Sequence, residues 1–243
     1  MKIAMAQMKM SANYNKNLKR SIEYINQAKD CDLLFFPEVQ LSPFFAQYRS
    51  TELPLNIENY ITELNGEEIT IFRQLAKENE MYISPNFYVN DCGCKYDMSL
   101  MIDCDGQILG KSKMVNVENN KNFYEKDYYT PSEDGYKVYQ TPLGNIGIVI
   151  CYDRHFPESV KSCAKQSADL VIIPTANTLE EDMPFFEKEI QTLASENKVI
   201  IAMCNRVGAE DKMHFAGQSL IASPQGKTLL KADDREQLII FEI

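Results

Sequence analysis

The sequence predicts an α/β fold in which helices flank central sheets. Short apolar runs alternate with segments of helical periodicity along the 243 residues, and several of these runs are apolar without interruption. Such runs are typical of strands whose sheet is covered on both faces. Gly and Pro, ten of each, are scattered rather than pooled, so no linker is evident. We therefore expect one domain over residues 1–243, with helices layered on sheets.

The first half of the chain supplies most of the expected strands. Residues 2–8 and 32–36 are buried strand patterns, and apolar residues recur at helical spacing between 18 and 28. Residues 67–79 predict an amphipathic helix. Further strands are expected at 81–89, 96–103, 106–115, 137–141 and 145–151. In 96–103, apolar and polar residues alternate, which predicts one covered face.

The second half repeats the alternation of strand and helix. Pro157 and Glu158 are typical of a helix start, since Pro suits the first turn and an early acid complements the helix dipole. Residues 184–197 predict a second helix, with Phe186, Ile190 and Leu193 facing inward. Strands are expected at 169–177, 199–207, 218–224 and 237–243.

Composition excludes several classes of function. Thirty-five acids against 25 bases give a net charge of −10, which argues against nucleic-acid or anionic-membrane partners. No apolar run approaches the roughly 18 residues of a membrane helix, and the start of the chain does not resemble a signal peptide. Seven cysteines, an odd number without regular spacing, indicate reduced thiols in a cytoplasmic protein.

The segment GNIGIVICYDRHFPES (144–159) places Cys151 at the exit of a strand. A cysteine nucleophile needs a base and a group that stabilises the oxyanion. The chain has only two histidines, His155 and His214, and nothing marks either as the partner. So few histidines also make a His-rich metal site improbable. The cysteines of DCGC (91–94) have no second pair at zinc-finger spacing, and we interpret this segment as a loop.

A carboxylate is the alternative base. Glu38 ends one buried strand as Cys151 ends another, and α/β sites lie beyond such carboxyl ends. Lys113 is a cation within an apolar strand pattern, and Glu125 lies in an aromatic-rich loop that could desolvate it. Each residue also has a structural interpretation: a solvated strand end, a snorkelling lysine, a buried small thiol. The residues alone thus leave a thiol–carboxylate–lysine enzyme as one alternative.

Several segments together resemble the nitrilase superfamily of carbon–nitrogen hydrolases, in the expected order along essentially the whole chain. The later segments are most similar to the N-carbamoylputrescine amidase and N-carbamoyl amide hydrolase branch. The matching segments are FFPEVQLSPF around Glu38, LGKSKMV around Lys113, FYEKDYYTPSEDGYKVYQT around Glu125, GNIGIVICYDRHFPES around Cys151, and downstream DLVIIPTAN, ASEN, MCNRVG and FAGQS.

The resemblance implies an αββα four-layer sandwich, paired into a homodimer or a higher homo-oligomer, that needs no metal or organic cofactor. It implies Glu38 as general base, Lys113 as oxyanion stabiliser and Cys151 as nucleophile. Glu125 would position the substrate and the lysine. The backbone N–H of Tyr152 could join Lys113 in binding the oxyanion.

One position departs from the pattern of the family. Many members carry a His shortly after the catalytic lysine, and here that position is Asn116. The departure leaves Lys111 as a second, less favoured choice for the catalytic lysine, since an insertion here shifts the register.

The remaining candidates are neighbours of the nucleophile and a strand end. Arg154 could bind a substrate carboxylate or form an internal ion pair. Asn177 could line the pocket or end its strand in a turn. Asp153 and Glu158 are expected to brace the turn after Cys151 or cap the next helix, and His155 is expected to be structural.

The expected function is hydrolysis of a small amide or ureido C–N bond with release of ammonia. N-carbamoylputrescine is the leading substrate, and an ω-amide, an N-carbamoyl amino acid or a nitrile are alternatives. Acyl transfer to an amine would use the same intermediate. A catalytically silent binding or assembly protein is the alternative from a different class.

Overall fold

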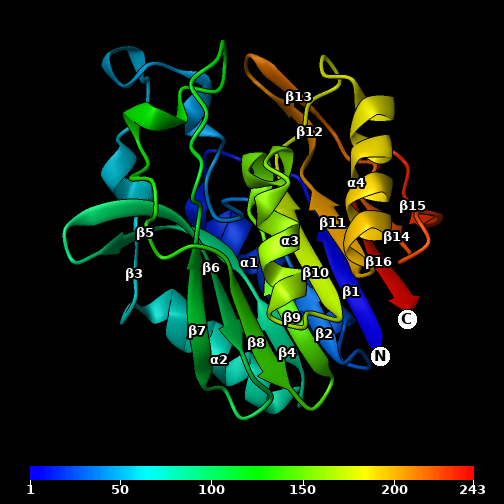
Figure 1. The fold of residues 1–243 in the computed structure, drawn as a ribbon. Helices are drawn as coiled ribbons and strands as arrows, with labels where there is room; N and C mark the ends of the chain where they lie inside the picture. The colour runs from blue at the N-terminus through cyan, green and yellow to red at the C-terminus, as the bar shows by residue number, and fades with distance from the viewer.

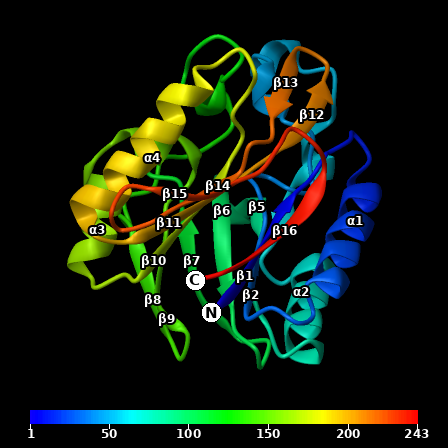
Figure 2. The same cartoon turned by 90° about the vertical axis from the view of Figure 1, so that its right-hand side faces the viewer.

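Two β-sheets face one another, and two α-helices cover the outer face of each. The computed structural model describes residues 1–243. The helices are α1 (Tyr14–Gln27), α2 (Glu67–Glu78), α3 (Glu158–Lys165) and α4 (Met183–Asn197). Figure 1 shows the chain along its sheets, and Figure 2 shows α1 and α2 on one side with α3 and α4 on the other. The predicted αββα sandwich is confirmed.

The first sheet has eight strands in the order β16-β1-β2-β4-β6-β5-β3, with β7 paired to β6. Strands β1, β2 and β4 are parallel, whereas β5, β6 and β7 form an antiparallel meander. The strands are β1 (Lys2–Gln7), β2 (Leu33–Phe35), β3 (Thr62–Glu63), β4 (Tyr82–Ser84), β5 (Asn86–Asp91), β6 (Cys94–Ile102), β7 (Ile108–Lys113) and β16 (Gln237–Glu242).

The second sheet has six strands in the order β15-β14-β11-β10-β9-β8, with β9, β10 and β11 parallel at its centre. A separate hairpin, β12–β13, follows β11. The strands are β8 (Lys137–Thr141), β9 (Gly144–Ile148), β10 (Leu170–Thr175), β11 (Ile200–Asn205), β12 (Val207–Glu210), β13 (Met213–Ala216), β14 (Leu220–Ala222) and β15 (Thr228–Lys231).

Local chemistry explains where the helices begin. The Asn13 side chain accepts a hydrogen bond from the backbone N–H of Lys16 at 2.9 Å and caps α1. Asp182 caps α4 in the same way, and Pro184 lies in its first turn. Pro157 directly precedes α3, as predicted. Phe186, Ile190 and Leu193 of α4 are buried, which confirms the predicted inward face.

Three apolar layers hold these elements together. The central layer lies between the two sheets and contains residues such as Leu33, Tyr88 and Ile172. The second joins α1 and α2 to the first sheet, and the third joins α3 and α4 to the second sheet. The site described below lies in the central layer, where side chains from both sheets meet.

Three details differ from the prediction. Residues 81–89 form two strands because Pro85, which has no N–H, lies between β4 and β5. Residues 96–103 have two covered faces rather than one, since Asp97 and Ser99 are as buried as their apolar neighbours. The β12–β13 hairpin and the strands β3 and β15 were not expected.

The two ends of the chain lie side by side. Strands β1 and β16 pair antiparallel, and the N-terminal amine of Met1 lies 2.8 Å from the carbonyl oxygen of Ile243. Both ends are visible together in Figure 2. None of the helices is long and apolar enough to cross a membrane.

Candidate active site

Cys151 lies just after β9 and begins a short 3₁₀ helix, Cys151–His155. Its φ of 41° is in the left-handed region, which is costly for a residue with a side chain and persists only when the surroundings hold it. The Thr175 hydroxyl, at the end of β10, lies 3.3 Å from the Cys151 sulfur. The thiol is therefore fixed at the inner end of the second sheet, as the sequence predicts.

Asp153 braces the turn after the nucleophile. Its carboxylate accepts the backbone N–H groups of Val115 and Asn116 at 3.1 and 2.7 Å, and the Tyr136 hydroxyl at 3.2 Å. These bonds tie the Cys151 turn to the segment that follows β7. The bracing role expected for Asp153 is confirmed, and Asn116 takes part in it.

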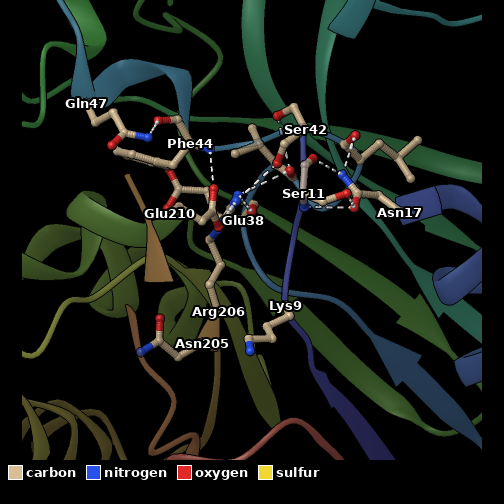
Figure 3. A network of polar contacts seen from close by, with 12 residues as sticks. Lys9, Ser11, Asn17, Glu38, Ser42, Phe44, Gln47, Asn205, Arg206 and Glu210 are labelled. Atoms are coloured by element: carbon tan, nitrogen blue, oxygen red, sulfur yellow. Dashed lines mark hydrogen bonds and ion pairs between the residues drawn. The ribbon is translucent and has the colours of Figure 1, made fainter. Parts of the chain in front are cut away.

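Glu38 lies in the turn after β2 and is completely buried. The fully buried Arg206 donates to the carbonyl oxygen of Glu38 at 3.1 Å and to that of Ser42 at 3.0 Å. The same guanidinium pairs with Glu210, as Figure 3 shows. Arg206 thus holds the backbone of this turn and fixes where the Glu38 carboxyl points.

Two further carboxyl groups, Asp97 and Glu125, are buried beside Glu38. Asp97, on β6, accepts a hydrogen bond from the Asn86 side chain at 2.7 Å. Glu125 accepts the backbone N–H of Glu118 at 2.9 Å. Both side chains are completely inaccessible to solvent. We refer to Glu38, Asp97 and Glu125 as the acid cluster.

Burial and mutual repulsion control protonation in the acid cluster. Burial, followed by the charge of Glu125, raises the pKa of Glu38 to about 7. Burial, followed by the charge of Glu38, raises the pKa of Asp97 and that of the Cys151 thiol well above their usual values. A carboxyl group with a pKa near neutrality, facing a thiol, can take up and return a proton at physiological pH.

Lys113 does not reach this site, and its predicted catalytic role is wrong. Lys113 pairs with Met98 across the β6–β7 ladder, so the two side chains share one face. Met98 packs in the apolar layer under α1 and α2. The Lys113 ammonium accordingly lies 2.9 Å from Asp91 and 4.0 Å from the centre of the Tyr96 ring. It is on the opposite face of the sheet from Glu38.

Lys111, the second choice, is on that outer face too. Its ammonium pairs with Asp91 at 3.0 Å, and its side chain is partly exposed. Met114, the residue after β7, has its side chain in the central layer, which also contains Cys151. Its backbone N–H donates to the Asp97 carbonyl at 3.0 Å. An uncharged thioether therefore occupies the inward position next to the acid cluster.

Arg154 and Asn177 bind each other rather than an open pocket. Arg154 donates to the Asn177 side chain at 2.8 Å and to the Cys151 carbonyl at 3.0 Å, and pairs with Glu189 at 3.3 Å. The predicted contact of Arg154 with a substrate carboxylate is therefore wrong, and the internal ion pair is confirmed. Glu189 also holds His155 at 2.6 Å, which confirms a structural role for that residue.

Tyr152 follows the nucleophile and lies between the site and the surface. Its ring, about 5.5 Å from that of Phe156, borders an open depression of about 560 Å³ that Asn116 and Glu118 also line. Cys151 itself is 6% exposed, and the residue after it, Tyr152, lines this depression.

Sequence reasoning missed four residues of the site. Period-2 alternation in β6 and β7 carries a signal for two of them, because Asp97 and Met114 occupy positions opposite in phase to Met98 and Lys113. Thr175 and Arg206 lie in the matching segments DLVIIPTAN and MCNRVG, but the match gave neither residue a role. They join the site only because β10 and β11 end beside the turns that carry Cys151 and Glu38.

An αββα sandwich with a thiol and a carboxyl group at its inner strand ends is an arrangement on which thiol-dependent hydrolysis can be built. The model of the carbon–nitrogen hydrolase family matches residues 2–243. The chain therefore belongs to that family, whose members are hydrolases of C–N bonds other than peptide bonds.

One curated relative is similar in sequence, and two solved structures share the fold. An N-carbamoylputrescine amidase from Arabidopsis thaliana is 27% identical over 227 residues, which cover 88% of this chain and 75% of the relative. A carbon–nitrogen hydrolase from Helicobacter pylori G27 superposes with a TM-score of 0.89 at 23% identity, covering 99% and 88% of the two chains. A Nesterenkonia amidase of the nitrilase superfamily superposes with a TM-score of 0.86 at 21% identity. The superposition covers 100% of this chain and 90% of the amidase chain.

Proposed function

We propose that the protein cleaves a small linear amide or N-carbamoyl C–N bond through a covalent intermediate on Cys151. The observation that carries this proposal is the burial of the Glu38 carboxyl beside the Cys151 thiol, with a Glu38 pKa raised to about 7. The fixed turns around both residues support it, because a nucleophile and its base must be held in place to react.

In the proposed reaction, Glu38 takes the thiol proton and the Cys151 thiolate attacks the amide or ureido carbon. The backbone N–H of Tyr152 binds the oxyanion. The C–N bond then breaks, and Glu38 returns the proton to the leaving ammonia, which leaves a thioester or carbamoyl-enzyme. A water molecule gives its proton to Glu38 and attacks, and Cys151 leaves as the thiol.

N-carbamoylputrescine is the leading substrate. The similarity to N-carbamoylputrescine amidases supports this choice. An ω-amide, an N-carbamoyl amino acid and a nitrile are tested beside it, since one thiol and one carboxyl group serve all these reactions.

The test is ammonia release from N-carbamoylputrescine, N-carbamoyl-β-alanine, a dicarboxylic monoamide and an aliphatic nitrile. We expect turnover of one compound by the wild type and none by Cys151→Ala. Cys104→Ala is the matched control, because Cys104 is a partly exposed thiol that belongs to no part of the site. Turnover that survives in Cys151→Ala would exclude the proposed nucleophile.

A second candidate, a catalytically silent binding protein, is favoured by one observation. The inward position next to the acid cluster is Met114 rather than a cation, and a buried neutral thiol is a poor nucleophile. Slow iodoacetamide labelling of Cys151 at neutral pH, together with no turnover of the four compounds, would favour this candidate over the first.

A further inference from the structure

The acid cluster has unused hydrogen-bond acceptors. Both carboxyl oxygens of Glu38, one oxygen of Asp97 and one of Glu125 have no hydrogen-bond partner, and neither has the Tyr129 hydroxyl. All four side chains are at least 96% buried. Burying polar groups without partners is costly, so a ligand that supplied several N–H donors would remove a large penalty.

No side-chain cation of this chain fills that need. Lys111 and Lys113 pair with Asp91 on the outer face of the sheet. The guanidinium of Arg206 binds Glu210 and backbone carbonyl groups. The guanidinium of Arg154 binds Asn177, Glu189 and the Cys151 carbonyl. The side chain that does turn inward, Met114, has no N–H to donate.

We propose that the acid cluster binds one primary ammonium group, carried either by the substrate itself or by a separate small amine. An ammonium has three donors and no acceptor, which complements carboxyl oxygens that have no hydrogen-bond partner.

The inference deepens the proposed function, because it names the charge of the ligand at the same site. A bound ammonium would favour the thiolate form of Cys151 and would stabilise an oxyanion formed beside it. The substrate class that follows is an amide with an amino group a few bonds from its carbonyl carbon, or a neutral amide that reacts only beside a bound amine.

Binding is tested by thermal unfolding with methylammonium chloride, against tetramethylammonium chloride, which has no N–H donor. We expect methylammonium at saturation to raise the unfolding temperature of the wild type by about 2 °C or more. Met114→Lys, which introduces an internal ammonium, should lose this response, whereas the control Met114→Leu should keep it. Equal responses in wild type and Met114→Lys, or none in the wild type, would overturn the proposal.

A second variant covers the case in which Met114→Lys does not fold. Asp97→Asn removes one carboxylate of the cluster while keeping the size of the side chain. The methylammonium concentration that gives half of the full shift in unfolding temperature should rise at least several-fold in this variant. An unchanged response in Asp97→Asn would also overturn the proposal.

The source of the ammonium is distinguished with two amides of nearly equal size, glycinamide and propionamide. Hydrolysis of glycinamide alone, inhibited by methylammonium, would assign the ammonium to the substrate. Hydrolysis of propionamide only when methylammonium is present would assign it to a separate amine. Hydrolysis of neither amide, together with no turnover of the four compounds named above, would contradict the proposed function, while an intact thermal response would leave the binding proposal standing.

Discussion

Both carboxyl oxygens of Glu38 are buried without a hydrogen-bond partner. The effect of this residue on the free energy of unfolding depends on pH. Its folded pKa of about 7 lies above the ordinary value of 4.5. The folded protein therefore keeps a proton that the unfolded chain releases between about pH 4.5 and 7. Since the folded state binds more protons there, the contribution of Glu38 to stability is most favourable below pH 4.5 and is lost as the pH rises through 7.

Glu38→Gln should remove this dependence on pH. The free energy of unfolding of the variant minus that of the wild type should rise by roughly 3 kcal/mol when the pH is raised from 5 to 8. Urea unfolding of both proteins at the two pH values, with reductant present, measures the difference. Parallel pH profiles would show that Glu38 titrates normally in the folded protein.

At the residue scale, the sequence was sufficient to predict that the side chains at the ends of buried strands lie in the site. Glu38 and Cys151 follow apolar runs, and the carboxyl ends of parallel strands meet at one edge. It was not sufficient for Arg154, because whether a guanidinium faces solvent or Glu189 depends on how α4 lies against the Cys151 turn. That arrangement is a tertiary fact with no local signal.

Strand β7 shows how one element decides what reaches the site. Side chains alternate between faces along a strand, so a shift of one residue exchanges the inner and outer sets. Here Ser112 bonds the Tyr139 hydroxyl in the central layer, and Lys113 consequently faces outward. The ladder with β6 also contains an irregularity between Met101 and Ile102. The face of the sheet on which Lys113 lies therefore depends on the register between β6 and β7. The sequence of β7 alone does not specify that register.

Lys113→Met tests this placement directly. If the ammonium lies with Asp91 on the outer face, its loss should change the rate of iodoacetamide labelling of Cys151 by less than about two-fold. The cost in stability should stay within about 1 kcal/mol, as for other ion pairs near the surface. Met114→Lys is the opposite control and should accelerate labelling. A large loss of Cys151 reactivity in Lys113→Met would place the lysine at the site after all.

Most elements could be predicted because their patterns are local. The helices α1, α2, α3 and α4 have caps or apolar stripes in their own sequence, and the central strands are apolar runs. The hairpin at 207–216 could not, since it packs through Arg206 and Phe215 against the turn after β2, far away in the sequence.

At the scale of the whole molecule, the outer helical layer of the second sheet ends in exposed aromatic rings. The side chain of Phe185 is 57% exposed and that of Phe156 is 38% exposed. We predict, from the family resemblance, that the chain forms a homodimer. Light scattering should give a mass of twice 27.9 kDa, and Phe185→Ser should weaken the association if this face is the interface. A monomeric mass across micromolar concentrations would contradict the prediction.

Because residues 1 and 243 are adjacent, the same fold could be built with its elements connected in a different order along the chain. Because β1 and β16 already bring these residues within hydrogen-bond distance, a short Gly-Ser peptide could join them. The chain could then be reopened in the exposed turn at Cys92 and Gly93. Such a circular permutant should fold and label at Cys151 like the parent. Cys151 and Glu38 would then follow one another along the chain in the opposite order, with the same neighbours in space.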